Sequence, residues 1–432
     1  MSDSQSLERS AIRRISLRIV PFLMICYFIA FVDRVNVGFA GHDLSRDLHL
    51  SSTVFGLGAG VFFLAYFLFE VPSNLLMQVV GARRWIARIM ISWGLVAACM
   101  ALIRGEWSFY ALRALLGVAE AGFFPGVILY LTYWFPREHR AKVVGYFMVA
   151  IPISTFLGSP VSGVILDHMN GTAGLAGWQW LFILEAVPAV LLGALCLVWL
   201  PDGPANAAWL PAEEREWLEN RLYEERTIAN RGPRQSLWQI LSDRRVMVLA
   251  LVYAGSTATN YGLSFWQPQM IKAFGMSNTM AGLFNAIPFF VGSVAMILWG
   301  LRSDRKKERV WHTSLALFVS AAGLTACLFV TGLPLTLVAL SMALVGCYAL
   351  KGPFWALSTE WLAGTAAAAG IAQINALGNL AGFVGPFLLG WIKDMTGSYA
   401  LGMLPMILLA VVGGIAVLTQ GRKPALVGHP AE

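Results

Sequence analysis

The feature that most constrains this chain is a run of about 20 apolar residues with few charges, which recurs along nearly the whole sequence. A helix of about 20 residues crosses a hydrocarbon core of about 30 Å. Only 13% of the residues are charged, whereas a soluble domain carries roughly 25%, so a soluble fold would have too little polar surface. The alternating segments of roughly 10 residues that are typical of a membrane β-barrel are absent. We therefore predict an all-α membrane protein that crosses the bilayer many times.

Breaks at charged or turn-rich stretches divide the chain into twelve predicted transmembrane helices. Their approximate ranges are 17–40, 53–77, 85–103, 108–135, 141–167, 178–200, 246–273, 280–301, 311–332, 335–361, 370–395 and 399–420. One long polar interruption separates the sixth span from the seventh. We predict an N-terminal six-helix half over 1–200, a cytoplasmic central loop over 201–245 and a C-terminal six-helix half over 246–432. Residues 210–218 of the loop predict a capped helix, either amphipathic at the membrane surface or simply solvated.

The positions of lysine and arginine predict the orientation of the chain. If the N-terminus is inside, 24 of the 31 basic residues fall in inside segments, four in outside segments and three within spans. Because cytoplasmic loops are enriched in lysine and arginine, both termini are predicted to be cytoplasmic. The basic residues of the cytoplasmic segments then explain the net charge of +7, and no nucleic-acid partner is expected. We predict a location in the inner, or cell, membrane.

The two halves carry an internal repeat at an offset of about 226 residues. The loop after the second span contains Gly81 and Arg83, and the loop after the eighth contains Asp304 and Arg305; we expect these four residues to take part in gating. The fifth and eleventh spans share a proline followed by a Gly-x-x-x-Asp ending. Two pseudo-symmetric halves suit alternating access about a site held between them. The alternative is that glycine and proline simply recur often in membrane helices.

Five of the charged residues inside the predicted spans are candidates for the site: Asp33, Arg34, Arg113, Glu120 and Lys351. A charge at the bilayer centre costs at least about 2.5 kcal/mol, so each needs a partner or a wet cavity. Asp33 and Arg113 lie at similar depth, which favours an ion pair between them and leaves Arg34, Glu120 and Lys351 for the cavity. Three cations against two carboxylates favour an anionic substrate. The alternative is that these charges form buried ion pairs that only hold helices together.

Polar and aromatic residues in the spans complete the set of candidates. Those retained for substrate binding, besides the three cations, are Tyr66, Trp355, Asn375 and Asn379. Aromatic residues within spans also mark packing, and the two asparagines, which share a helix face, must hydrogen-bond inward to a ligand or to another helix. Three further acids are predicted to be structural: Glu70, Glu185 and Glu360.

Five segments carry a further signal: Asp33-Arg34-Val-Asn36, the run from Arg113 through Glu120 to Gly126, the run from Trp178 to Glu185, Lys351-Gly-Pro-Phe-Trp355, and the run from Ile374 through Asn375 and Asn379 to Phe383. Together they resemble the major facilitator superfamily, and within it the anion:cation symporter family, over essentially the whole chain. The last two segments are similar to the branch that contains tartrate, phthalate and 4-hydroxyphenylacetate permeases.

The resemblance implies the two-half fold of that superfamily and proton-coupled uptake of a small organic carboxylate such as tartrate. It implies that Asp33 and Glu120 are the protonation sites and that Arg34 contacts the substrate carboxylate. Tyr66, Trp355 and Asn375 match substrate-pocket positions. The chain departs from the family pattern at two positions, where Phe31 replaces a common tyrosine and Gln78 replaces the usual aspartate of the loop motif.

Two other transport functions stay open at this point: a permease for an aromatic acid such as 4-hydroxyphenylacetate or phthalate, and a facilitative anion exchanger without proton coupling. An enzyme is not expected, because the six histidines lie at or near loops and tails and form no His-x-x-x-His or Ser-His-Asp pattern. We expect no cofactor and no metal, and we expect the proton to be the coupling ion. The expected partners are the anion, protons and membrane lipids, and the expected state is a monomer.

Overall fold

The computed structural model describes residues 3–229, 243–362 and 366–421, and these residues form helices joined by turns. Contacts group the chain into two compact units. Unit 1 contains Met1–Pro233 and Ser264–Ala286, and unit 2 contains Arg234–Leu263 and Ile287–Glu432. Two long helices, α11 (Arg244–Lys272) and α12 (Asn278–Lys306), therefore contribute to both units.

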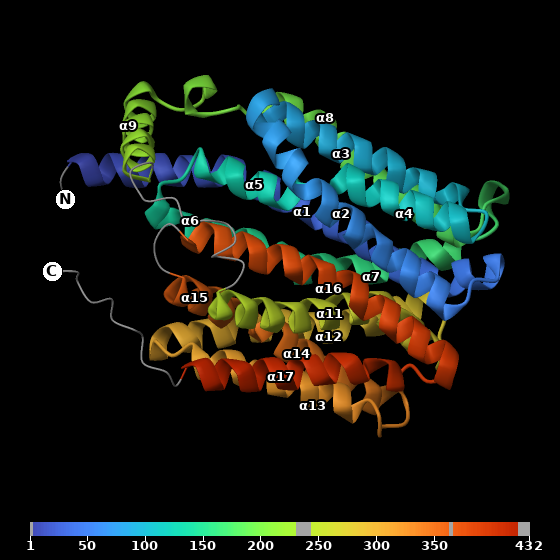
Figure 1. Ribbon diagram of the computed structural model, residues 1–432. Coiled ribbons are helices and arrows are strands. Elements are labelled where there is room, and N and C mark those ends of the chain that lie inside the picture. The colour runs from blue at the N-terminus through green and yellow to red at the C-terminus, as the bar shows by residue number, and fades with distance from the viewer. Residues whose placement is uncertain (1–2, 230–242, 363–365, 422–432) are drawn as a thin grey trace. The chain divides into compact units, whose positions relative to one another are not determined.

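Unit 1 is built mainly from the first nine helices of the chain (Figure 1). They are α1 (Asp3–Leu48), α2 (Ser52–Val80), α3 (Ala82–Cys99), α4 (Glu106–Glu120), α5 (Phe123–Thr132), α6 (Arg137–Met148), α7 (Ala150–His168), α8 (Gly177–Trp199) and α9 (Ala212–Ala229). Three 3-10 turns, η1 (Met100–Leu102), η2 (Thr172–Gly174) and η3 (Pro204–Asn206), lie between them. The adjoining ends of α11 and α12, residues 264–272 and 278–286, complete the unit.

Unit 2 contains the remaining parts of α11 and α12 and the helices that follow them. These are α13 (Val310–Ala326), α14 (Leu333–Ala349), α15 (Lys351–Trp361), α16 (Ala366–Thr396), the 3-10 turn η4 (Leu401–Met403) and α17 (Leu404–Gly421). Helix α13 packs against both α14 and α17. A buried apolar cluster that includes Leu249, Leu317, Phe354 and Ile374 joins α11, α13, α15 and α16.

Eleven helical segments in the described part of the chain are long and apolar enough to cross a membrane, and the 17-residue α13 is a shorter apolar helix. The all-α membrane fold is therefore confirmed. Some predicted spans differ in detail, because the fourth is divided into α4 and α5 and the first continues well beyond residues 17–40 as α1. The flanking stretches of α1 contain Glu, Gln, Leu and Arg, which are good helix formers, so the helix continues outside its apolar part.

Small residues allow the helices of unit 1 to pack closely, as is usual for helices in a membrane. Helices α3 and α8 lie side by side (Figure 1). A Cβ atom added at Gly94 of α3 would lie 2.7 Å from Cγ2 of Val190 on α8. Such a contact is too short, so glycine at this position is required for the observed separation of the two helices.

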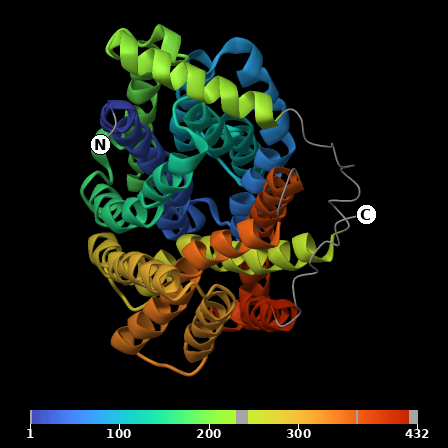
Figure 2. The same cartoon turned by 90° about the vertical axis from the view of Figure 1, so that its left-hand side faces the viewer.

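The predicted helix of the central loop is present as α9, and it is anchored by polar contacts. In Figures 1 and 2, α9 lies across the N-terminal part of α1. Glu214 of α9 binds Arg14 of α1 at 3.2 Å and accepts a hydrogen bond of 2.7 Å from Ser10. Glu225 binds Arg140 of α6 at 3.0 Å. We call α9 and these ion pairs the α9 belt; it fixes the helix to unit 1.

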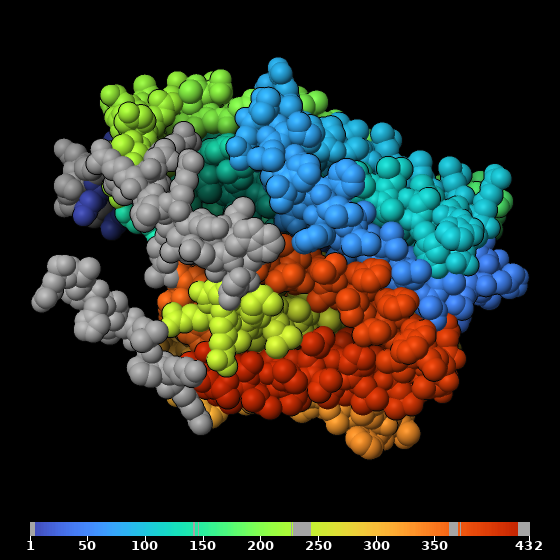
Figure 3. Space-filling view, in the orientation of Figure 1, coloured from blue at the N-terminus to red at the C-terminus, as the bar shows by residue number. Residues whose placement is uncertain are grey.

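The exposed face of α2 is strongly apolar, as expected of a helix that faces lipid. Leu68, Val71, Leu75 and Val79 are 60%, 66%, 59% and 85% exposed. Their spacing of three or four residues places them on one side of the helix. Figure 3 shows the blue segment of α2 at the surface of unit 1. This stripe of large apolar side chains agrees with a multi-pass membrane protein.

Candidate functional site

The four charged candidates of the first and fourth predicted spans are buried inside unit 1. Asp33 and Arg34 of α1 are 2% and 6% exposed, and Arg113 and Glu120 of α4 are both 0% exposed. A buried charge is costly unless a partner compensates for lost hydration. The contacts of these four residues therefore show how the chain compensates for this cost.

Arg34 and Glu120 form a buried ion pair in which Nη2 of the arginine donates to Oε1 of the glutamate. The guanidinium carbon of Arg34 also lies 5.1 Å from the ring centre of Phe31 and 5.4 Å from those of Phe62 and Tyr66. Aromatic faces at such distances attract a cation. The cation of α1 thus has one carboxylate and three rings around it, and two predicted site residues, Arg34 and Tyr66, lie together.

The predicted ion pair between Asp33 and Arg113 is wrong. Arg113 donates instead to the backbone carbonyls of Gly58 at 3.3 Å and Ala59 at 3.0 Å, both on α2. Asp33 accepts a hydrogen bond of 2.7 Å from the indole nitrogen of Trp93 on α3. The argument from similar depth could not show which direction around its helix each side chain takes.

A break in the fourth span places Glu120 at a helix end. Helix α4 stops at Glu120 and α5 begins at Phe123. Between them, Gly122 has a φ of +87°, and a Cβ atom there would lie 2.4 Å from Oγ of Ser73 on α2. Glycine satisfies both the positive φ and the lack of space. Interrupted membrane helices often border substrate and ion sites in transporters, and this break adjoins the ion pair.

In unit 2, Lys351 and Trp355 come together around Tyr253 of α11. Nζ of Lys351 lies 5.8 Å from the ring centre of Tyr253 and 5.9 Å from that of Tyr348. The rings of Trp355 and Tyr253 are 5.2 Å apart. Within the described ranges, no carboxylate lies at ion-pair distance from Lys351. Lys351 is therefore a cation that aromatic rings surround.

Asn375 and Asn379 lie on one face of α16, and both are half-buried. Gly378 lies between them on α16, and a Cβ atom there would overlap the ring of Tyr253. Helix α16 thus meets, at Gly378, the same ring that borders Lys351. Sequence reasoning missed Tyr253, whose only signal was its position as an aromatic residue within the seventh predicted span.

The first predicted gating loop is held by an acid that sequence reasoning also missed. The backbone N–H of Arg83 donates to Oδ1 of Asp202 at 3.0 Å, and Nε of Arg83 lies 3.7 Å from Oδ2. Gly81 precedes this contact with a φ of +96°. Asp202 thus supplies a carboxylate to a loop in which Gln78 replaces the usual acid. It lies 119 residues from Arg83 in the sequence, so no local motif could indicate it.

The second predicted gating loop contains a small ion-pair network. Asp304 binds Arg309 at 2.8 Å, and Arg309 also lies 3.6 Å from Glu360. Arg305, by contrast, is exposed. The structure therefore brings Asp304 together with Arg309 and Glu360 rather than with its sequence neighbour.

Glu308 in the same loop caps the N-terminus of α13. Its carboxylate accepts hydrogen bonds from the backbone N–H groups of Trp311 at 2.7 Å and His312 at 3.1 Å, and it lies 2.7 Å from Nδ1 of His312. Partial burial opposes ionisation, but these hydrogen bonds outweigh it and lower the pKa of Glu308 below its ordinary value. The carboxylate therefore stabilises the start of α13 in its ionised form.

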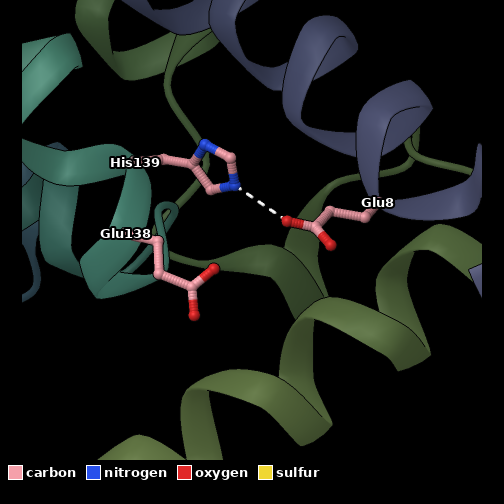
Figure 4. A group of neighbouring side chains, drawn as sticks. All are labelled: Glu8, Glu138 and His139. Carbon is pink, nitrogen blue, oxygen red and sulfur yellow. Dashed lines mark hydrogen bonds and ion pairs between the residues drawn. The ribbon is translucent and has the colours of Figure 1, made fainter. Parts of the chain in front are cut away.

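Three side chains of types that can bind a metal ion lie together where α1 meets α6. Figure 4 shows Nε2 of His139 and Oε1 of Glu8 joined by a hydrogen bond of 3.0 Å, with Glu138 beside them. Glu138 is already paired with Arg221 of α9. Two arginines of α1 also line the adjacent cavity of about 540 Å³. Because these cations would repel a metal ion, we assign the group to the α9 belt.

Comparison with known proteins supports the fold and the broad function. The sequence profile of the Major Facilitator Superfamily matches residues 23–386. A protein of Agrobacterium vitis named "Putative tartrate transporter" is 51% identical over 97% of this chain and 96% of its own length. A second protein with the same name and organism is 52% identical over 97% of this chain and 93% of its own length.

Solved structures show the same fold at low sequence identity. A crystal structure of a bacterial homologue of the human lysosomal transporter Spinster superposes with a TM-score of 0.76 at 16% identity, covering 94% of this chain and 98% of that one. The profile match, the related sequences and the helical fold agree that the protein is a membrane transporter and not an enzyme. The chain belongs to the major facilitator superfamily.

Proposed function

We propose that this transporter takes up a small organic carboxylate, such as tartrate, together with protons by alternating access. The observation that carries the proposal is the buried ion pair between Arg34 and Glu120. The name of the two Agrobacterium vitis relatives supports a tartrate-like substrate.

The ion pair offers a simple mechanism for coupling. Ionised Glu120 occupies the guanidinium group of Arg34, which is the group best suited to bind a carboxylate through two parallel hydrogen bonds. A proton on Glu120 removes the negative charge and releases Arg34 to accept the carboxylate of the substrate. Loss of that proton restores the competition and expels the anion. Proton and anion therefore bind together and leave together.

Other residues of the two units serve the same cycle in this proposal. Tyr66, whose ring borders Arg34, offers a hydroxyl group to the substrate, and Asp33 is a second protonation site. Lys351 in unit 2 supplies a further cation. Arg113 supports α2 through its carbonyl contacts.

The remaining candidates keep the roles expected from the sequence. Trp355, Asn375 and Asn379 line the substrate pocket, and the two loops that contain Gly81 and Asp304 act in gating. The distribution of basic residues supports cytoplasmic termini and a location in the inner membrane. We also propose that the protein acts as a monomer.

An aromatic acid is the second candidate substrate, and one feature of unit 2 favours it. The rings of Tyr253 and Phe354 are stacked at 5.5 Å, and Trp355 lies 5.2 Å from Tyr253. Lys351 adjoins these rings. Stacked aromatic surfaces beside a cation would suit a substrate such as phthalate or 4-hydroxyphenylacetate.

Uptake into proteoliposomes would test the proposal. The purified full chain is reconstituted, and labelled tartrate, phthalate, 4-hydroxyphenylacetate and galactonate are offered with and without an inward proton gradient. We expect one acid to accumulate only with the gradient. Accumulation of an aromatic acid instead of tartrate would select the second candidate. Counterflow that does not respond to the gradient would refute proton coupling and indicate an exchanger.

A further inference from the structure

Two buried carboxyl groups of unit 1, Asp33 of α1 and Glu185 of α8, have only neutral hydrogen-bond donors around them. They are 2% and 6% exposed. Oδ2 of Asp33 accepts from Trp93 at 2.7 Å, and Oε1 of Glu185 accepts from the hydroxyl of Ser162 at 2.6 Å. Among the described residues, the second oxygen of each carboxyl group has no hydrogen-bond partner at normal distance, and the nearest further donor to Glu185 is the neutral amide of Asn36 on α1. Neither group therefore has the contacts that an ionised carboxylate needs when it is buried.

The cations of the surrounding helices are engaged elsewhere. On α1 and α4, Arg34 binds Glu120 and Arg113 binds backbone carbonyls. On α3, the guanidinium of Arg88 lies 4.0 Å from the ring centre of Trp85.

In the part of the chain that the structure describes, α7 and α8, which also pack against α1, offer no positive charge to the pair either. On α7, Asp167 accepts hydrogen bonds from Asn278 and Thr279 at the far end of the helix, where His168 also lies. Helix α8 contains no charged residue except Glu185. Among the described charged groups near Asp33, Glu185 and Glu120 are acids and carry the same sign of charge as an ionised Asp33.

Two carboxyl groups that repel each other in a buried site without a cation cannot both be ionised at reasonable cost. A protonated carboxyl group gains an O–H donor and loses the charge that burial penalises. We propose that Glu185 is a proton-holding residue of this transporter and forms with Asp33 a carboxyl pair that keeps at least one proton. This inference rests on the proposed function where it assigns that proton to the transport cycle.

The pair is separate in its chemistry from the Arg34–Glu120 ion pair. Protonation of Glu120 releases Arg34 for the substrate, whereas the proton of the carboxyl pair neutralises a buried carboxylate that has no cation beside it. The transporter thus holds protons at two separate sites, on different groups. More than one proton can then accompany each substrate molecule.

Infrared difference spectroscopy on the full chain in lipid nanodiscs would test the inference. We expect the wild type at neutral pH to show the carbonyl band of a protonated carboxylic acid, and Glu185→Gln to lose that band or lose part of it. Glutamine has nearly the shape of a protonated glutamate, so we expect this variant to fold with a melting temperature near that of the wild type. Ser162→Ala removes only a hydrogen-bond donor and should shift the band rather than remove it. The matched surface control is Glu106→Gln, at the exposed start of α4, which should leave the band unchanged.

A band that is identical in the wild type and Glu185→Gln would overturn the inference, as would its absence from the wild type. A second experiment, on transport, measures the proton-to-substrate ratio in proteoliposomes from the membrane potential at which net substrate flux reverses. We expect a lower ratio in Glu185→Gln, and an unchanged ratio would exclude Glu185 from the cycle. Wild-type uptake that ignores the proton gradient would refute the proposed function instead, while the infrared result would still decide whether Glu185 holds a proton.

Discussion

Replacing Glu120 with glutamine removes the carboxylate that holds Arg34 but keeps a side chain of nearly the same size. If the substrate carboxylate and Glu120 compete for one guanidinium, the variant should bind the anion without first breaking an ion pair. Its affinity should also depend less steeply on pH, because one of the groups that take up a proton is gone. The control is Glu106→Gln on the same helix, where the side chain is exposed.

The size of the effect follows from the contact that is lost. A hydrogen bond to a charged group contributes about 1.5–3 kcal/mol, and 1.4 kcal/mol is a factor of ten in a binding constant. At alkaline pH we therefore expect Glu120→Gln to bind the substrate roughly 10- to 100-fold more tightly than the wild type does. At acidic pH the wild type has its own proton on Glu120, so the two affinities should converge.

Isothermal titration of the purified protein with the substrate found in the uptake assay measures both affinities across the pH range. In proteoliposomes, Glu120→Gln should keep exchange but lose much of the stimulation by a proton gradient. An affinity that falls with rising pH as steeply in Glu120→Gln as in the wild type would refute the competition between Glu120 and substrate. The same slope in Glu106→Gln and the wild type is the expected control result.

Three further changes test other contacts. Arg113→Lys removes the hydrogen bonds to the two carbonyl groups of α2 and should lower the free energy of unfolding by about 1–3 kcal/mol, which thermal unfolding in detergent measures. The pH dependence of substrate binding should stay unchanged, and an altered pH dependence would contradict this structural role. Lys272→Met removes the 2.8 Å ion pair with Asp43 and should raise hydrogen exchange across residues 264–286, whereas unchanged exchange would show that the pair does not hold this segment. Glu308→Ala removes the cap of α13 and should lower the free energy of unfolding by about 1 kcal/mol near neutral pH. Because the folded state lowers the pKa of Glu308, this stabilisation is present above the ordinary pKa of 4.5 and is lost as the pH falls through the lowered pKa. A difference in melting temperature between wild type and variant that stays constant at low pH would contradict this assignment.

The sequence was sufficient for the membrane fold because hydropathy acts along the chain. Each apolar run predicts a span without knowledge of its neighbours, and polar segments predict the breaks. The division of the fourth span was harder, since Gly122 is one of 42 glycines and only the nearby Ser73 shows why a side chain cannot fit there.

The candidate site was predictable in composition but not in pairing. Membrane insertion makes a buried charge conspicuous, so Arg34 and Glu120 could be selected from the sequence. Their partners depend on how each helix is rotated about its axis, and the expected Asp33–Arg113 pair is wrong for that reason. Trp93, Tyr253 and Asp202 were missed because their contacts join positions far apart in the chain.

The length of α1 has a mechanical consequence. The helix runs without interruption from the α9 belt to Arg34, and Pro21 does not end it. At 1.5 Å per residue, the stretch from Glu8 to Arg34 is a lever arm of about 40 Å. If α1 tilted by about 5° about the ion pair, its end at Glu8 would move by roughly 3 Å. We therefore expect a spin label near residue 8 to amplify any tilt of α1 that accompanies protonation of Glu120.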